Sequence, residues 1–372
     1  MSVPSPHLYR QQALAQGRDP ATVDRTLEIE SQILARNAYP ILTLNHLAQL
    51  TGATWTYLRD IVARRRDPYL SIDRLKQNGN TRAISSPQPV LMDVQRWILH
   101  NVLSACAVHP SSYAYQRERS ILKCAEAHLY SKWLVKLDIH DFFGSIPERR
   151  IYPVFHDLGY PRLLSLELAR LCTRSRALIW EAEDIEKYGD SPYPVSPPTR
   201  LPQGAPTSGA LANAVMFEAD SKLHNLALDE GLVYTRYSDD LILSTGAEFT
   251  RQRAVELIRR VAAILERSGF SLHRTKTRVI PPGARHVVLG LLLAEGRVRL
   301  LPEFKRRVEV HIRGVAKFGV AEHARHRRFD SVFAMINHVD GYIAFAHSID
   351  ATFASKVRDE WNAALEDGGY TL

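Results

Sequence analysis

The chain has 372 residues, and its 48 Lys and Arg against 40 Asp and Glu give it a net charge of +8. An apolar content of 45% and a charged content of 24% are those of a globular protein, which excludes a chain that is fibrous or disordered as a whole. The longest apolar run, residues 287–294, is far shorter than the ~20 residues that span a bilayer, and the first residues lack the pattern of a signal peptide. We therefore expect a cytoplasmic protein with no membrane partner, whose positive charge favours a polyanionic partner.

The first 69 residues are expected to form a helical N-terminal extension. Asp19 and Pro20 are typical of a helix cap and first turn, and apolar residues continue from there at helical spacing. Residues 42–62 predict two short helices joined by a turn at Thr51-Gly52. This pair is similar to a DNA-binding helix-turn-helix, followed by the basic run 64–66, but a helical hairpin packed on a larger domain explains the pattern equally simply, and we favour it.

A strand carrying one acid is predicted at residues 133–139. Its apolar residues Trp133, Val135, Leu137 and Ile139 lie on one face, and Asp138 lies on the other. A lone aspartate at a strand end is more often a cap or a solvated residue, so this segment alone decides little.

A loop rich in Pro and Gly follows at residues 201–209 and leads into an apolar helix. It comes after an acidic, Pro-rich stretch at residues 181–200 that we expect to be an exposed loop. The backbone at 201–209 can approach a ligand closely, although an ordinary helix-entry turn would have the same composition.

Two adjacent acids occupy the turn of a predicted β-hairpin. Strand-like residues 232–237 and 241–244 flank Ser238-Asp239-Asp240, whereas a turn made only for chain reversal prefers Asn-Gly or Asp-Gly. A divalent cation relieves the repulsion between the acids. Carboxylates suit Mg²⁺ or Mn²⁺, and carboxylates from two strands could hold two ions about 3.5–4 Å apart for phosphoryl transfer. Each of the three motifs is weak by itself, but their combination and order are specific.

Residues 70–320 resemble reverse transcriptases, specifically the retron-type RNA-directed DNA polymerases of bacteria. Leu137–Phe143 is similar to the first palm motif of that family, Gln203–Ser208 to the second, and Tyr237–Asp240 to its YxDD motif. Further similarities are the fourth motif at Phe270–Val279, the primer-grip turn at Val288–Leu291 and the fingers hairpin at Leu75–Ile84.

The resemblance implies a catalytic set built on these acids. Asp138 and Asp239 would bind two catalytic Mg²⁺ or Mn²⁺ ions, with Asp240 in support. Lys276 would be a proton donor to pyrophosphate, although a surface lysine at a helix end is an equally good interpretation.

The resemblance also implies a nucleotide-binding set for dNTPs. Phe143 occupies the position of the aromatic steric gate, whose ring would collide with a ribose 2′-hydroxyl. Gln203 would contact the sugar or base of the nucleotide, and Lys76 and Arg82 would contact its phosphates.

Two further strings are similar to retron markers and keep two of three marker residues each: Cys124-Ala125-Glu126-Ala127-His128, against Asn-Ala-x-x-His, and Val288-Leu289-Gly290, against Val-Thr-Gly. A lone histidine is more often structural, but in this context we assign His128 a role in RNA binding or priming. Residues 297–330 carry ten Lys and Arg against four Asp and Glu, so we expect Arg306, Arg307 and Arg313 to contact RNA phosphates.

The expected fold is α+β, a right-hand polymerase. After the extension at 1–69, it has fingers at 70–130, a palm with a small antiparallel sheet at 131–290, interleaved with segment 149–200, and a basic helical thumb at 291–372. The expected function is RNA-directed DNA polymerase.

If it is a retron enzyme, it would prime from a 2′-hydroxyl of its own structured non-coding RNA. The product would be branched RNA–DNA (msDNA), made for anti-phage defence with an effector protein. The alternatives are another bacterial defence or diversity-generating reverse transcriptase and, from a different class, a non-catalytic nucleic-acid-binding regulator.

Overall fold

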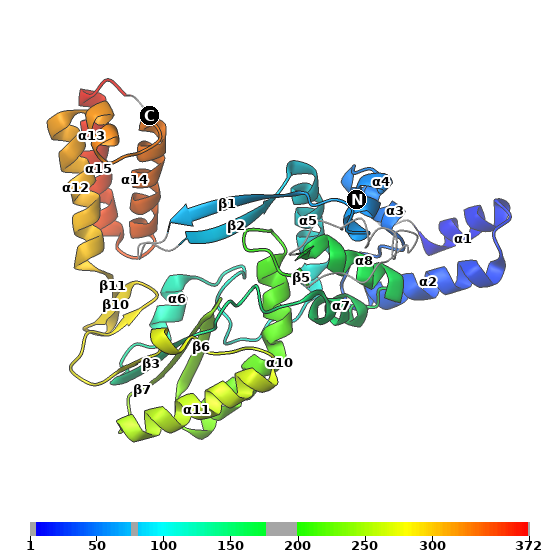
Figure 1. Ribbon diagram of the computed structural model, residues 1–372, viewed down its shortest axis with the longest axis horizontal. Coiled ribbons are helices and arrows are strands. Elements are labelled where there is room, and N and C mark those ends of the chain that lie inside the picture. The colour runs from blue at the N-terminus through cyan, green and yellow to red at the C-terminus, as the bar shows by residue number, and fades with distance from the viewer. Residues whose placement is uncertain (1–4, 76–80, 176–198, 371–372) are drawn as a thin grey trace, which may run out of the picture. The chain divides into compact units, whose positions relative to one another are not determined.

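The computed structural model describes residues 5–75, 81–175 and 199–370, with the side chains of residues 73–75 and 81–83 outside the description. The chain divides into two compact units, each made of several segments. The first unit contains residues 1–117, 138–225 and 259–274, and the second contains residues 118–137, 226–258 and 275–372. Each unit is described by itself below (Figure 1).

The first unit begins with helices, as the sequence predicts. Asp19 caps the second helix, because its carboxylate accepts a hydrogen bond from the Thr22 amide at 2.9 Å. Gly52 ends the third helix in the left-handed conformation, with φ of 73°. The four helices are α1 (Pro6–Ala15), α2 (Pro20–Leu34), α3 (Leu44–Thr51) and α4 (Trp55–Val62).

The arginine run after α4 serves structure in this unit. The Arg64 guanidinium is buried and donates to Glu148 at 2.7 Å and to the Thr173 carbonyl at 2.7 Å, so it ties the end of α4 to distant parts of the chain. Arg65 pairs with Asp60 at 2.9 Å on the surface. Because Arg64 is not available to a ligand, this arrangement favours the packed helical hairpin over the DNA-docking interpretation.

The rest of the first unit consists of a β-hairpin, a group of helices and two short strands. Strands β1 (Tyr69–Leu75) and β2 (Thr81–Pro87) are antiparallel. The helices of this part are α5 (Pro89–Asn101), the 3-10 turn η1 (Leu103–Ala105), α7 (Glu148–Asp157), α8 (Arg162–Cys172) and most of α10 (Ser208–Asp229). The short strands β4 (Arg174–Ser175) and β5 (Thr199–Arg200) pair with each other. Most of the loop predicted at 181–200 lies outside the described residues.

The second unit holds the predicted palm sheet. Its strands lie in the order β6, β7, β3, β8 and comprise Val233–Tyr237, Asp240–Thr245, Trp133–Asp138 and Arg278–Ile280 respectively. The prediction of one buried face on β3 was too simple, because Leu134 and Val135, on opposite faces, are both buried. Helix α6 (Ile121–Glu126) packs against β6, and α11 (Arg251–Arg267), which is divided between the two units, lies between β7 and β8 in sequence.

The C-terminal part of this unit is a helical bundle that follows a small sheet. The sheet contains β9 (Val287–Val288), β10 (Leu291–Ala294) and β11 (Arg297–Leu300). The helices are α12 (Pro302–Phe318), α13 (Val320–His326), α14 (Val332–His347) and α15 (Ala351–Asp367), which lie side by side in Figure 1. Val308, Met335 and Trp361 are fully buried in their shared core. Within the described residues, no helix is both long enough and apolar enough to cross a membrane.

Candidate active site

Asp138 is the last residue of β3, and its surroundings hold it firmly. Its side chain is 7% exposed. Its carbonyl accepts a hydrogen bond from the His273 amide at 2.7 Å, and the next residue, Ile139, forms a β-bridge with Leu272. The strand end is therefore fixed by the segment after α11, which directs the Asp138 carboxylate from a rigid element.

Asp239 occupies a tight turn between β6 and β7. Tyr237 pairs with Asp240 across the hairpin, so only Ser238 and Asp239 form the loop. Ser238 has φ of 58°, a left-handed conformation that costs free energy for any residue with a side chain. The fully buried Arg236 guanidinium donates to the Ser238 carbonyl at 3.1 Å and places a positive charge beneath the acidic turn.

Asp138 ends β3, Asp240 begins β7 directly after Asp239, and these two strands are neighbours in the sheet. Carboxylate oxygens are the ligands that Mg²⁺ prefers, and proteins commonly supply one or two carboxylates while substrate phosphates supply the rest. Within the described part of the chain, no group of three potential metal-binding side chains comes together. Asp138 and Asp239 carry donors of the type that Mg²⁺ takes, and their role as metal ligands stays a prediction.

Phe143 lies in the loop after β3, where it contacts two other aromatic rings. Phe142 is buried at a ring-centroid distance of 5.3 Å and anchors the segment in the core. Tyr115 meets Phe143 edge-on at 6.2 Å, and its ring also covers Gly209 at the start of α10. A Cβ added at Gly209 would lie 2.4 Å from this ring, so only glycine permits the contact.

Asn213 holds the Tyr115 segment in place, a function that the sequence analysis did not identify. Asn213 is fully buried in α10, accepts from the Ser112 hydroxyl at 3.0 Å and donates to the Ala114 carbonyl at 2.8 Å. Tyr115 follows with φ of 60°. The sequence feature that could have identified Asn213 is its amide side chain within the apolar run after the loop, because a buried amide requires hydrogen-bond partners.

The Gln203 loop is attached to the fingers hairpin. The Gln203 carbonyl accepts from the Ser85 amide of β2 at 2.7 Å. Gly204, with φ of 116°, lies so close to β2 that an added Cβ would be 2.7 Å from Cγ2 of Ile84. Arg82 belongs to β2 and Lys76 lies outside the described residues, so their roles stay predictions.

Comparison with known proteins decides the family. A family model described as reverse transcriptase (RNA-dependent DNA polymerase) matches residues 74–293. The chain belongs to this family. The match confirms the predicted right-hand polymerase fold, with its small antiparallel palm sheet.

The similar curated proteins are retron reverse transcriptases. Retron Mx162 reverse transcriptase from Myxococcus xanthus is 36% identical over 60% of this chain and 47% of its own length. Retron Ec86 reverse transcriptase from Escherichia coli is 28% identical over 78% and 81%, and retron Mx65 reverse transcriptase from Myxococcus xanthus is 32% identical over 78% and 63%. This chain thus spans about half of the Mx162 protein. These relatives confirm the resemblance to retron-type enzymes.

His128 of this reverse transcriptase is a structural residue. Its ring is 1% exposed, and its two nitrogens lie 2.7 Å from the hydroxyls of Ser244 and Thr235. Burial lowers the pKa of His128 to about 4, so the ring is neutral at physiological pH. Because the ring is buried, the structure does not favour direct contact with RNA, and the role of His128 in RNA binding or priming stays a prediction. The ring links α6 to the palm strands β6 and β7.

Other predicted residues of the reverse transcriptase lie on its surface. Lys276 is exposed at the end of the 3-10 turn η2 (Arg274–Lys276). Arg306, Arg307 and Arg313 are exposed on α12. Arg313 pairs with Glu309 at 2.8 Å, a solvated contact that leaves its charge accessible. The positions of these groups are compatible with their predicted roles, which stay predictions.

Proposed function

We propose that this reverse transcriptase polymerises DNA on an RNA template, with Asp138 and Asp239 holding the catalytic metals and Asp240 in support. The observation that carries the proposal is the strand order, because β7 lies beside β3, Asp138 ends β3, and Asp239 and Asp240 lie at the start of β7. Two Mg²⁺ or Mn²⁺ ions, when bound, would activate the primer 3′-hydroxyl and neutralise charge on the leaving pyrophosphate.

The nucleotide site would be formed by the loop of the second motif and the residues after β3. Gln203 would contact the sugar or base of the incoming dNTP, while Lys76 and Arg82 of the fingers hairpin would bind its phosphates. Phe143 would exclude ribonucleotides by contact with a 2′-hydroxyl. Lys276 would give a proton to the departing pyrophosphate.

The template would be a structured non-coding RNA, which the retron names of the relatives support. In this proposal the enzyme primes from a 2′-hydroxyl of that RNA and makes branched RNA–DNA (msDNA). It would act with an effector protein in anti-phage defence.

Primer extension on an RNA template with Mg²⁺ tests the activity. The parent should incorporate dNTPs, and Asp239→Asn should reduce the rate at least a hundredfold, because the carboxylate charge that binds metal is lost. Asp359→Asn, a matched change at an exposed position of α15, should have no effect. Equal rates for the parent and Asp239→Asn would contradict the proposal and favour the non-catalytic alternative.

Two further measurements address the finer points. Phe143→Ala should admit ribonucleotides, and unchanged discrimination would remove Phe143 from the gate.

The nucleic acid that co-purifies with the protein should contain a 2′–5′ linkage that a debranching enzyme cleaves. RNA with no attached DNA would contradict the self-priming proposal and leave the polymerase proposal standing.

A further inference from the structure

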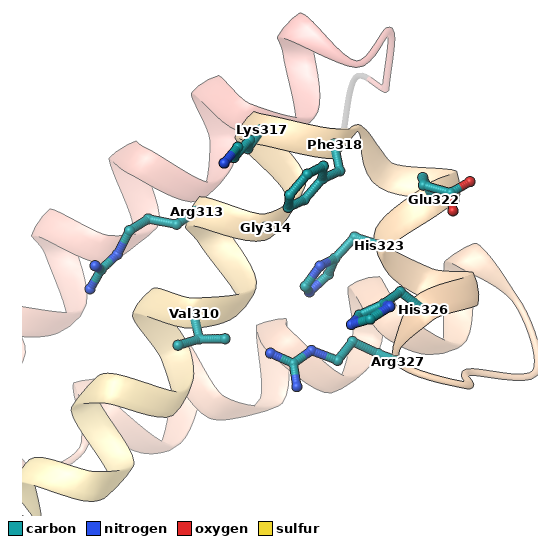
Figure 2. Close-up of a pocket in the computed structure, with 9 residues that line it drawn as sticks. All are labelled: Val310, Arg313, Gly314, Lys317, Phe318, Glu322, His323, His326 and Arg327. Carbon is teal, nitrogen blue, oxygen red and sulfur yellow. The ribbon is translucent and has the colours of Figure 1, made fainter.

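A pocket of about 570 Å³ opens between α12 and α13 in the helical bundle, within the basic segment 297–330. Both helices belong to the second unit. Figure 2 shows that Phe318 and His323 face the gap between the helices, while Arg313 and Lys317 extend from the outer side of α12. The lining residues are Val310, Arg313, Gly314, Lys317, Phe318, Glu322, His323, His326 and Arg327.

The inner wall of this pocket is partly aromatic. Gly314 lets the His323 ring approach α12, since an added Cβ would lie 2.2 Å from Cε1 of that ring. Nε2 of His323 is 3.1 Å from Nδ1 of His311, which orients the ring. The Phe318 side chain is 60% exposed, and Val310 is 36% exposed. Apolar surface is thus left uncovered beside a fixed ring.

The rim of the pocket is positively charged. Lys317 and Arg327 have no ion-pair partner among the residues that the structure describes. The only acid in the lining, Glu322, pairs with Arg325 and points away from the gap in Figure 2. Of the three basic side chains in the lining, Arg313 pairs with Glu309, while Lys317 and Arg327 leave two positive charges beside an apolar interior.

We propose that this pocket binds one unpaired nucleotide of a structured RNA. The base would stack against the exposed Phe318 ring, above the buried His323, and its phosphates would lie against Lys317 and Arg327. A protein segment with an apolar anchor would fill the interior but would not use the basic rim, whereas a nucleotide matches both. Unpaired bases that stack on aromatic side chains are the usual target of sequence-specific RNA recognition. The inference deepens the proposed function, because it rests on an RNA partner.

The test uses two synthetic RNA hairpins, identical except that one carries a single bulged 2-aminopurine. We expect the parent to bind the bulged hairpin at least about fivefold more tightly, because stacking of one base contributes roughly 1–3 kcal/mol. The fluorescence of the 2-aminopurine should fall on binding. Phe318→Ala should lose both the preference and the fluorescence change. Phe333→Ala, at a 70% exposed phenylalanine of α14, should keep both.

A second variant protects the test against a folding defect. Lys317→Gln leaves the apolar wall intact and should weaken binding of both hairpins with a shallower salt dependence. Equal affinity of the parent for the two hairpins, or a preference that survives Phe318→Ala, would overturn the proposal. Primer extension by the parent is measured separately, on a primer annealed to an RNA template without a bulge. A parent that extends primers but ignores the bulge disproves the pocket assignment alone, and one that prefers the bulge but does not polymerise disproves only the polymerase proposal.

Discussion

The contact between Gly209 and Tyr115 offers a test in which two physical effects have opposite signs. Gly209 lies in the first turn of α10, where alanine ordinarily stabilises a helix by up to about 1 kcal/mol relative to glycine. Here the added Cβ would meet three ring atoms of Tyr115 at 2.4, 2.6 and 2.8 Å. Because carbon atoms pack at about 3.5–4 Å, the ring must retreat by roughly 1 Å.

This displacement is expected to outweigh the gain in helix propensity. Overpacking by a methyl group costs about 1–3 kcal/mol. Tyr115 is 54% exposed, but its backbone, at φ of 60°, is held beside the hydrogen bonds of Asn213 and cannot relax freely. We expect Gly209→Ala to lower the free energy of unfolding by about 1 kcal/mol. In a Tyr115→Ala background the clash is absent, so the same change should stabilise the protein.

Urea unfolding of the four proteins in this cycle measures the coupling, which we expect to be about 1–3 kcal/mol. Gly341→Ala in α14 is the matched control, because nothing lies within 4 Å of an added Cβ there, and it should be stabilising. Since Tyr115 also contacts Phe143, Gly209→Ala should reduce discrimination against ribonucleotides in primer extension. Stabilisation by Gly209→Ala to the same extent in both backgrounds would refute the reasoning.

Three further predictions concern residues outside that contact. Arg64→Met should destabilise the protein by about 1–3 kcal/mol in urea unfolding, because the carbonyls of Thr173 and Arg170 lose a buried donor while Glu148 keeps its ion pair with Arg170. Arg65→Met, at an exposed pair, should cost less than about 1 kcal/mol. Similar losses would contradict the assignment. The pKa of His128 is lowered from 6.5 to about 4 in the folded state, so unfolding takes up a proton between these values and stability should fall as pH decreases from about 6.5 to 4. His128→Gln should make the pH dependence of the urea midpoint shallower in that range, and an unchanged profile would show that other groups cause it. Leu289 and the glycine after it form the turn between β9 and β10, with φ of 48° and 80°. Because asparagine tolerates this conformation better than leucine, Leu289→Asn should raise the urea midpoint by the equivalent of up to about 1 kcal/mol. A lower midpoint would mean that the Leu289 side chain contributes more through packing.

The elements that carry the acids could be predicted from the sequence because their signals are local. The alternation of residues 133–139 and the paired acids at the turn after residue 237 depend only on neighbouring residues. The structure has β3 and the β6–β7 hairpin where these patterns indicate. The helix pair at 42–62 and its turn at Gly52 were also predicted correctly, since a left-handed glycine is a local requirement.

The roles of single buried polar residues were decided only by the tertiary structure. His128 was expected to bind RNA, but Ser244 and Thr235, more than a hundred residues away in sequence, accommodate both ring nitrogens in the core. Arg64 belongs to a basic run, yet its side chain is buried in an ion pair with Glu148 and stabilises the fold. The local periodicity of the sequence cannot identify a contact partner that is so far away along the chain.

The sequence by itself determined the family and the type of each element that carries the predicted catalytic carboxylates, because these depend on residue identity and short-range spacing. Only the tertiary structure placed Tyr115 over Gly209, fixed that segment through Asn213 and opened the pocket beside Gly314. The physical reason is that close packing is set by the approach of distant segments. At Gly209 and at Gly314, the absence of a Cβ allows two segments to pack in contact.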